Sequence, residues 1–186
     1  MISGGGMILR EEEFKKEAVK IAAFLMAESA RTAPKSKGED DIEIVYIDGE
    51  ELQELAKKME ELAERDKDFL RDAESVKKSQ AVLLIGVNGE KSIGVDCGAC
   101  GFESCSEFKR AKRRLGKDFV GPNCIFKLLD LGIALGSAVK LSALIGVDTR
   151  IMYRVGTAGK KLGYIKSDVV MGIPIAAKGK NPFFDR

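Results

Sequence analysis

The sequence predicts an α/β fold of the α+β kind, in which helices and a sheet form one sandwich that carries a small four-cysteine insert. The 186 residues are 45% hydrophobic and 32% charged, which is enough apolar material for one packed core. Helical stripes alternate with short runs of branched residues, and all four cysteines fall within residues 97–124. We therefore expect a single domain over residues 7–186, an insert over residues 94–124 and a flexible leader over residues 1–6.

The first predicted element is a helix over residues 8–32. Its first turn is acidic, which suits the positive end of a helix dipole, and its apolar residues recur at helical spacing. This spacing places Phe14, Ala18, Ile21, Ala22 and Leu25 on the buried face. Pro34 ends the helix, and a polar loop follows.

Two strands and two helices come next. Alternating branched residues predict a strand over residues 42–47, and apolar stripes predict helices over residues 52–63 and 69–76. The unbroken apolar run over residues 81–87 has the length of a strand. Because such a strand is buried on both faces, we place it in the centre of the sheet.

The cysteines interrupt the second half of the chain. Asn88-Gly89 predicts a hairpin whose second strand covers residues 91–95. We expect a short basic helix over residues 104–115. The long helix over residues 124–145 is apolar on most sides, so it belongs in the middle of the protein. The last two elements are a helix and a strand over residues 151–162 and 169–176.

The composition excludes several functions. The chain contains no histidine, so Ser-His-Asp catalysis, Cys-His catalysis and histidine-ligated zinc are excluded. The formal charge of +2 provides no global field for nucleic acid. The longest uncharged apolar run, residues 131–139, is far shorter than the roughly 20 residues of a membrane span. The first residues lack the pattern of a signal peptide, so the sequence predicts a cytoplasmic protein without a membrane segment.

The cysteines have the spacing C-x2-C-x4-C-x18-C. Cys97, Cys100 and Cys105 lie within nine residues, and Cys124 follows a Gly-Pro turn at the start of the long helix. Each iron of a [4Fe–4S] cluster needs one terminal sulfur ligand. A compact loop therefore supplies three corners of the cluster, and a distant residue supplies the fourth.

The residues between the cysteines suit such a cluster. Gly98 and Gly101 permit left-handed backbone angles, which let amide groups turn toward the negative sulfurs. Ala99 and Phe102 are apolar and keep water away. Structural zinc is one alternative, although it usually takes two separate CxxC pairs and only one occurs here. Two disulfides are another, although they are typical of small secreted chains.

A basic run follows the third cysteine and comprises Lys109, Arg110, Lys112, Arg113 and Arg114. One interpretation is a solvated helix face. The other is a docking surface for an acidic redox partner. A [4Fe–4S] core with four thiolates carries two negative charges, which nearby cations balance. Nucleic-acid binding is not favoured, since Phe108 is the only aromatic residue beside the run.

Residues 96–105 read Asp-Cys-Gly-Ala-Cys-Gly-Phe-Glu-Ser-Cys. This segment resembles the four-cysteine [4Fe–4S] domain of electron-transport and corrinoid iron–sulfur proteins, in which the pattern C-G-x-C-G-x-x-x-C precedes a short helix and a fourth cysteine next to proline. In this chain Pro122 stands two residues before Cys124. The resemblance covers residues 94–124 and implies the binding of one cluster.

The whole chain resembles an uncharacterised prokaryotic family described as ferredoxin-domain-containing proteins. Besides the cysteine segment, this resemblance rests on residues 31–38, Arg-Thr-Ala-Pro-Lys-Ser-Lys-Gly, and on the ending over residues 172–174 and 179–186. It implies cluster binding and no known reaction.

A further resemblance, to the FMN-dependent nitroreductases, rests on segments that occur in that family's order: Ala33-Pro34 and residues 81–87, 130–134, 145–148 and 172–174. It implies a nitroreductase-like helix–sheet sandwich, FMN as a cofactor and a homodimer. Two motifs of that family are missing, the Arg-x-Ser-x-Arg segment that grips the FMN phosphate and the Asn-x-Gln-Pro-Trp after the Ala-Pro. Their absence argues against flavin binding.

These patterns together predict an iron–sulfur redox protein. It holds one [4Fe–4S] cluster on its four cysteines and carries single electrons to or from a partner protein or a second cofactor. One alternative is a non-catalytic interaction module that binds zinc or a cluster. The other is an FMN-dependent reductase of the nitroreductase type. An oxidoreductase activity is compatible with the fold, and no residue stands out as catalytic.

Overall fold

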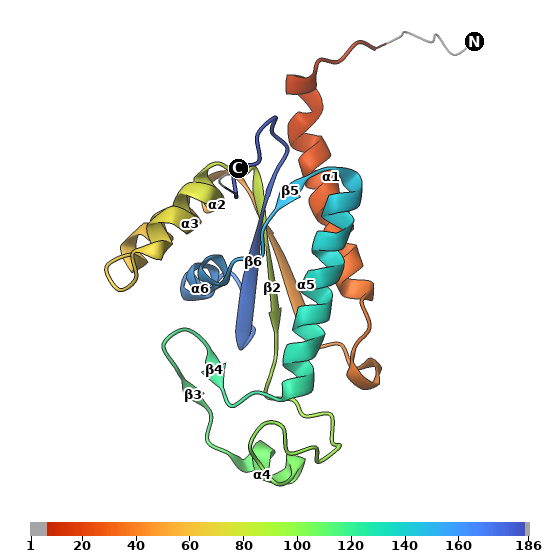
Figure 1. The fold of residues 1–186 in the computed structure, drawn as a ribbon, viewed down its shortest axis with the longest axis vertical. Coiled ribbons are helices and arrows are strands. Elements are labelled where there is room, and N and C mark those ends of the chain that lie inside the picture. Colours follow the sequence, from red (N-terminus) through yellow and green to blue (C-terminus); the bar gives the residue numbers. More distant parts are fainter. Residues whose placement is uncertain (1–6, 185–186) are drawn as a thin grey trace, which may run out of the picture.

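The computed structural model describes residues 7–184, so the leader predicted over residues 1–6 lies outside the described residues. Figure 1 shows the elements, which are in chain order α1 (Glu11–Thr32), the short 3-10 helix η1 (Ser36–Gly38), β1 (Ile42–Ile47), α2 (Gly49–Leu62), α3 (Asp68–Lys77), β2 (Ala81–Val87), α4 (Cys105–Arg110), β3 (Arg114–Leu115), β4 (Val120–Gly121), α5 (Ile125–Ile145), β5 (Asp148–Thr149), α6 (Tyr153–Lys161) and β6 (Val169–Ala176).

The main sheet has four antiparallel strands in the order β1-β2-β6-β5. β2 pairs along its whole length with β1 on one side and with β6 on the other, so that Leu84 lies opposite both Val45 and Gly172. Every residue of β2 is buried. The unbroken apolar run therefore forms a central strand, as predicted.

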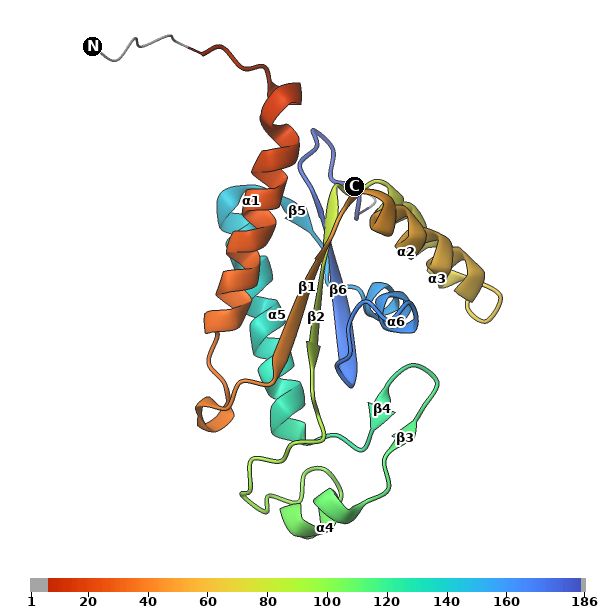
Figure 2. The same cartoon turned by 180° about the vertical axis from the view of Figure 1, so that it is seen from behind.

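Helices cover both faces of this sheet (Figures 1 and 2). α1 and α5 lie side by side on one face, and α2, α3 and α6 lie on the other. Successive residues of β2 pack alternately into two hydrophobic cores, one on each face of the sheet. Leu83 packs into the core with Met26, and Leu84 packs into the core with Phe69. The predicted helix–sheet sandwich is confirmed.

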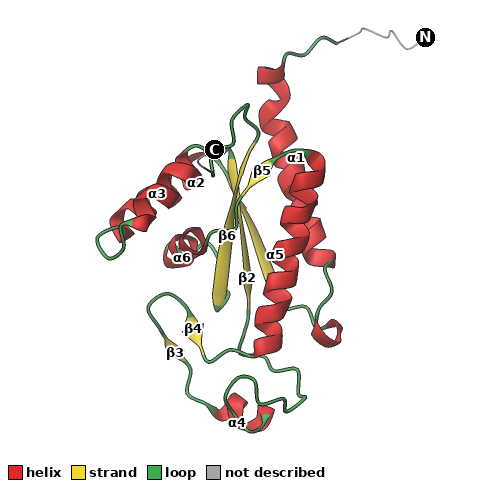
Figure 3. Cartoon of the chain, viewed as in Figure 1, coloured by secondary structure: helices red, strands yellow, loops and turns green. Residues whose placement is uncertain are grey.

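Between β2 and α5 the chain leaves the sheet and forms the insert, which consists mostly of loops (Figure 3). Two predictions about it are wrong. Residues 91–95, which lie within the described part of the chain, form no strand, because β1 and β6 already occupy both edges of β2. The helix predicted over residues 104–115 ends at Arg110. The chain beyond it is extended and forms the small β3–β4 ladder.

The buried face of α1 also differs from the prediction, since Ala22 is the only residue of the predicted stripe that is buried. The helix buries Val19, Ala23 and Ala30, whose small side chains allow close approach to α5 and the sheet. The larger stripe with Phe14 and Ile21 is exposed, Ile21 by 57%. Helical spacing revealed two apolar stripes on this helix without showing which of them faces the core.

The long helix α5 is not enclosed, in contrast to the prediction. It buries Leu131 and Ala138 toward the sheet, whereas Leu129, Ile133 and Leu144 are exposed. Only its inner side has neighbours within the described residues. We refer to the exposed apolar residues of both helices as the outer apolar face: Phe14, Ile21, Leu25, Leu129, Ile133 and Leu144.

Within residues 7–184, α5 is also the one helix that is long and apolar enough to cross a membrane by length and composition. Core helices of ordinary globular proteins meet the same criterion. α5 packs against α1 and β2 and buries two charged residues, Lys127 and Asp130. The criterion is therefore weak evidence for a membrane span here.

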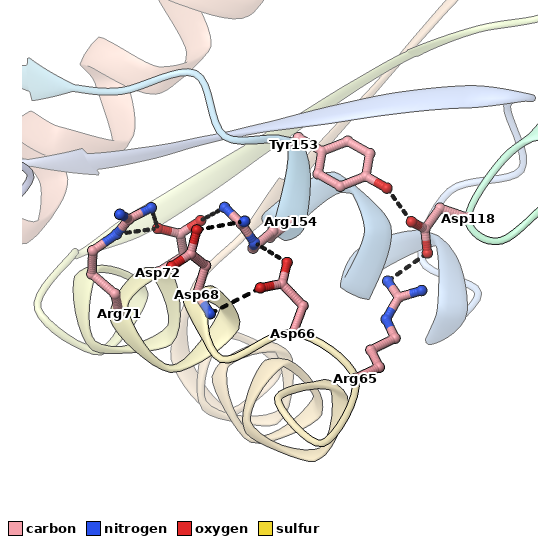
Figure 4. A network of polar contacts seen from close by, with 8 residues as sticks. All are labelled: Arg65, Asp66, Asp68, Arg71, Asp72, Asp118, Tyr153 and Arg154. Carbon is pink, nitrogen blue, oxygen red and sulfur yellow. Dashed lines mark hydrogen bonds and ion pairs between the residues drawn. The ribbon is translucent and has the colours of Figure 1, made fainter.

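The helices on the opposite face are joined by Arg154 of α6 (Figure 4). Its guanidinium lies 2.9 Å from Asp66, 2.8 Å from Asp68 and 3.2 Å from Asp72. The hydrogen bond from Arg154 lowers the pKa of Asp66. Asp72 is buried and also pairs with Arg71, whose side chain is 55% exposed. One arginine thus fastens α6 to α3 and to the loop before it.

A second set of polar contacts fastens the insert to the same side of the molecule (Figure 4). Asp118, in the turn between β3 and β4, is buried and lies 2.5 Å from the guanidinium of Arg65. It also accepts a hydrogen bond from the hydroxyl of Tyr153. Burial and this carboxylate raise the pKa of Tyr153. The β3–β4 turn is therefore tied to α6 and to the α2–α3 loop.

A third network fixes the first turn of α5 and centres on Lys127, which is fully buried. Its ammonium lies 2.8 Å from the carboxylate of Asp41 and donates a 3.0 Å hydrogen bond to the carbonyl of Glu39. Asp130 lies 4.0 Å away and accepts 2.8 Å hydrogen bonds from the amide and the hydroxyl of Ser36. Burial tends to raise the pKa of Asp41, but hydrogen bonds from Lys127 and Lys91 lower it.

We expect Arg154→Met to lower the free energy of unfolding by about 2–3 kcal/mol, because it leaves the buried Asp72 without its inner partner. Arg71→Met is the matched control. It removes an exposed partner of the same carboxylate and should cost less than about 1 kcal/mol. Urea unfolding followed by circular dichroism measures both. Equal losses in the two variants would refute a structural role specific to Arg154.

Lys127→Met should cost about 3–4 kcal/mol at pH 7, because it removes the buried cation beside the Asp41 and Asp130 carboxylates and leaves Asp41 only the exposed Lys91, 2.5 Å away. Lys58→Met, at an exposed pair with Glu61, is the control and should cost less than about 1 kcal/mol. The pKa of Asp41 is lower in the folded protein than in the unfolded chain, where it is about 4. This difference stabilises the folded state at pH values above about 4, and the stabilisation is lost as the pH falls through the folded-state pKa. The difference between Lys127→Met and wild type should therefore shrink below about pH 4. A difference that stays constant down to pH 3 would contradict this pairing.

Candidate metal centre

All four cysteines line one small cavity, which we call the cysteine cavity. Cys97 and Cys100 come from the loop after β2, Cys105 is the first residue of α4, and Cys124 immediately precedes α5. The structure thus brings together the predicted ligands from both ends of the insert. Most of the other side chains that line the cavity are apolar: Ile93, Val95, Phe102, Phe108, Ile125 and Phe126.

The cysteines differ in their exposure. Cys124 is buried, Cys100 and Cys105 are half-buried, and Cys97 is exposed. All four thiols are free. The cavity is therefore closed toward the sheet and nearest to solvent at Cys97. Phe102 lines it as predicted, whereas Ala99 is exposed in the loop and does not.

Two glycines shape the loop that carries Cys97 and Cys100. Gly98 has φ = 72° and Gly101 has φ = 86°, both in the left-handed region that residues with a Cβ rarely adopt. The amide of Gly101 donates a 2.9 Å hydrogen bond to the carbonyl of Gly98. This tight turn faces Cys97 and Cys100 into the same cavity, and the predicted left-handed conformation of both glycines is confirmed.

Backbone groups hold Cys105 in place. Its amide donates a 2.6 Å hydrogen bond to the carboxylate of Asp96, and the hydroxyl of Ser104 accepts a 3.1 Å hydrogen bond from the amide of Glu107 at the start of α4. The pKa of the Cys105 thiol is lowered, first by a hydrogen bond from the backbone of Asp96. The hydroxyl of Ser92 and the amides of Val95 and Gly94 act in the same direction. These donors favour the thiolate, which is the form that binds metals.

Cys124 is the point at which the insert returns to the sheet. Its amide donates a 2.7 Å hydrogen bond to the carbonyl of Gly89, two residues beyond the end of β2. Its carbonyl accepts a 3.2 Å hydrogen bond from the amide of Leu128 in α5. The buried Cys124 therefore has a backbone fixed by both the end of β2 and the start of the long helix.

The insert is closed a second time around Asp168, the residue before β6. Its amide donates to the carbonyl of Val87 at 3.1 Å, and its carbonyl accepts from the amide of Val120 at 3.2 Å. The guanidinium of Arg113 lies 2.8 Å from the Asp168 carboxylate and donates a 2.9 Å hydrogen bond to the carbonyl of Pro122. Arg113 is thus occupied within the protein, which differs from its predicted role in partner docking.

The other four residues of the basic run, Lys109, Arg110, Lys112 and Arg114, are exposed. They do not share one helix face, because α4 ends at Arg110 and the later residues lie on extended chain. Extended chain turns alternate side chains to opposite sides, which is why Arg113 points inward between two exposed neighbours.

Ser92 provides a test of whether the cavity suits an inorganic cluster. Its hydroxyl is buried, lines the cysteine cavity and has no hydrogen-bond partner among the described residues except the Cys105 sulfur that it faces. A buried hydroxyl without a stronger acceptor costs free energy. The sulfur-rich surface of a cluster would supply such an acceptor. Four thiols, apolar walls and an unsatisfied donor therefore fit an iron–sulfur cluster.

The two candidate groups would use the same four thiols in different ways. A zinc ion would bind all four sulfurs itself, with each Zn–S bond about 2.3 Å long. A four-iron cluster would give each cysteine its own iron. Within residues 7–184 no group of three or more His, Cys, Asp or Glu side chains is arranged to hold a metal ion as it stands. The preference for a cluster rests on the sequence pattern, which contains only one CxxC pair.

Sequence reasoning missed several residues of this centre. Ser92 and Asp96 were not identified because nothing distinguishes a serine or an aspartate in a loop until the fold shows what it faces. Asp168 is 44 residues beyond Cys124, and only the sheet register brings it to the insert. The one signal in the sequence that could have pointed to Asp96 is its position directly before Cys97. In the structure Asp96 adopts a left-handed conformation with φ = 47°.

Comparison with known proteins adds the family. Residues 120–186, which include Cys124, match the model of a family described as "Uncharacterized protein containing a ferredoxin domain". The chain is also 70% identical to a protein of Archaeoglobus fulgidus, over 97% of this chain and 98% of that protein.

Solved structures share the fold at low sequence identity. An FMN-dependent nitroreductase from Clostridium difficile matches with a TM-score of 0.55 and 14% identity, over 87% of this chain and 77% of that one. A nitroreductase family protein from Clostridium novyi matches with a TM-score of 0.54 and 14% identity, over 93% and 77%. The NADPH:FMN oxidoreductase from Vibrio harveyi matches with a TM-score of 0.51 and 12% identity, over 98% and 66%.

These matches agree with two of the three resemblances seen in the sequence, those to the ferredoxin-domain-containing family and to the nitroreductases. The nitroreductase structures show the fold alone, because their identity to this chain is so low. The sequence match to the Archaeoglobus protein spans nearly the whole chain, and the family model covers its C-terminal part. The chain belongs to one family with the Archaeoglobus protein, its residues 120–186 match the model of the ferredoxin-domain family, and it has the nitroreductase fold.

Proposed function

We propose that this protein is an iron–sulfur redox protein that binds one [4Fe–4S] cluster through Cys97, Cys100, Cys105 and Cys124. The observation that carries the proposal is the single cavity that all four thiols line, although they come from three separate segments. When bound, the cluster would accept or release one electron at a time.

The residues around the cavity have distinct roles in this proposal. The four thiolates bind the irons. Backbone amides near Cys105 and the hydroxyl of Ser92 donate toward sulfur and stabilise its negative charge. Phe102, Phe108 and Phe126 exclude water from the inner side. A cluster with four thiolates would bring the formal charge from +2 to 0.

The exposed cations Lys109, Arg110, Lys112 and Arg114 are the proposed docking surface for an acidic redox partner. They lie on the insert itself, so a partner would meet the side of the molecule that carries the cluster. Four unpaired thiols suit a reducing compartment, and we propose a cytoplasmic location for the protein.

The two alternatives have weaker support. A zinc-binding interaction module would use the same four thiols, although structural zinc usually takes two separate CxxC pairs and this chain has one. An FMN-dependent reductase is favoured by the fold alone. The arginine nearest the Ala-Pro segment, Arg31, is occupied by Asp40 at 2.6 Å and by the carbonyl of Ile42 at 2.8 Å. The residues present therefore do not fit an FMN phosphate in the manner of the nitroreductases.

The outer apolar face supports a homodimer. A groove of about 360 Å³ runs between α1 and the end of α5, and its apolar lining includes Phe14, Ile21 and Ile145. Exposed apolar surface of this extent on two packed helices marks a protein interface. We propose that a second copy of the chain covers it.

The ligand assignment is tested by Cys124→Ser. We expect anaerobically prepared wild type to be brown, to bleach with dithionite and to hold about four irons and four sulfides per chain. Cys124→Ser should retain less than roughly half of that iron, because it lacks one corner ligand. Ser106→Ala, an exposed change beside Cys105, is the control and should retain all of it.

Two outcomes would overturn the proposal. Equal iron content in Cys124→Ser and wild type would remove Cys124 from the ligand set. A colourless wild type with about one zinc per chain would favour the interaction module, and FMN released by acid precipitation would favour the flavin reductase.

The dimer is tested by Ile133→Glu, which places a charge on the outer apolar face. We expect wild type to sediment as a dimer and the variant as a monomer. Lys57→Glu, a charge reversal at an exposed position of α2 on the opposite face of the sheet, should remain dimeric, which shows whether added charge alone matters. A wild type that sediments as a monomer at micromolar concentration would refute this interface.

A further inference from the structure

A second hollow lies directly beside the cysteine cavity. This groove, which we call the insert groove, has a volume of about 620 Å³ and is bounded by the loop after α4, the β3–β4 ladder and the first residue of β6. Small-molecule sites typically measure about 300–1,000 Å³. The groove is therefore large enough for a small ligand.

The walls of the insert groove are mostly apolar and include the rings of Phe102, Phe119 and Pro122. Phe119 is half-buried and held edge-to-face against Tyr153, with the ring centroids 5.6 Å apart. Asp118, which precedes it, is anchored to Arg65. The aromatic wall is thus a rigid part of the fold, which suits stacking against a flat ring system.

Two cations stand at the insert groove, Lys112 and Arg114. Both are exposed, and neither forms an ion pair or a side-chain hydrogen bond within residues 7–184. Their neighbour Arg113, in contrast, is paired with Asp168. An apolar groove with two unpaired cations is complementary to a flat molecule that carries a negative charge.

Phe102 connects the insert groove with the cysteine cavity, because its ring lines both. It packs edge-to-face on Phe108, with the ring centroids 5.8 Å apart, and Phe108 lines the cysteine cavity as well. A molecule in the groove would be separated from the cavity by one side chain.

We propose that the insert groove binds a small planar aromatic anion. That this ligand exchanges electrons with the metal centre rests on the proposed function, whereas the binding itself does not. A fused ring system would stack on the aromatic wall of the groove. A sulfonate, carboxylate or phosphate group on this ring system would pair with Lys112 and Arg114.

The experiment is isothermal titration calorimetry on the full chain, prepared anaerobically, with anthraquinone-2-sulfonate as the anionic probe. The neutral probe is 2-(hydroxymethyl)anthraquinone, which has the same rings. We expect the anion to bind about tenfold more tightly than the neutral probe. Lys112→Ala/Arg114→Ala should weaken the anion about tenfold and the neutral probe less than about twofold.

Lys57→Ala/Lys161→Ala is the matched control. It removes the same charge from exposed positions outside the groove and should leave both affinities unchanged. Ala111→Trp fills the groove from the end of α4 and should abolish binding of both probes. Circular dichroism checks that each variant is folded, and the double-alanine variant changes only exposed residues.

Three results would overturn the proposal: no binding of either probe, equal affinity of wild type for both probes, or an equal loss in the control variant. Iron is measured on the same samples, so that the two proposals fail separately. Iron-free protein that still binds the anion upholds the groove and contradicts the cluster. Iron-loaded protein that binds neither probe upholds the cluster and contradicts the groove.

Discussion

The complete pairing of β2 is the constraint on which the rest of the structure depends. With β1 on one edge and β6 on the other, this strand offers no edge to the chain that follows it. The chain must leave the sheet at Gly89, and it returns only at Cys124, where an amide-to-carbonyl hydrogen bond joins the two points at 2.7 Å. Everything between them is the insert. The distant fourth cysteine is therefore brought to the other three by the geometry of the sheet.

Buried and half-buried ion pairs secure this arrangement. Lys127 and Asp41 fix the first turn of α5 beneath Cys124, Arg113 and Asp168 close the insert, and Asp118 ties its tip to the body. A buried ion pair adds little stability over a well-packed apolar pair, but its geometry is demanding and a misplaced partner is costly. Such pairs suit a segment made mostly of loops, because they specify one position for it where little apolar surface is available.

The fold and the thiol-lined cavity belong to different parts of this chain. The nitroreductase sandwich supplies the two helical layers and the antiparallel sheet, while the sequence lacks the motifs with which that family grips FMN. The thiol-lined cavity sits on a connection between two elements of the sandwich, and none of the residues that line it belongs to either hydrophobic core. A site grafted on a connecting loop can therefore differ in chemistry from the fold that carries it.

Local pattern was sufficient for most of the helices and strands and for finding four cysteines that share a cavity. Helical spacing located α2, α3 and α6, the apolar run located β2, and C-x2-C-x4-C-x18-C identified four thiols that do line one cavity. Each of these signals lies within a few neighbouring residues. The failures were non-local. No strand formed at residues 91–95 because both edges of β2 were occupied, and Phe14 was exposed because a second, smaller stripe packed more closely.

Ser92, Asp118 and Asp168 acquired their roles from partners that are up to 81 residues away along the chain. Spacing in a sequence reports which residues share an element, whereas burial and ion pairing depend on which elements meet.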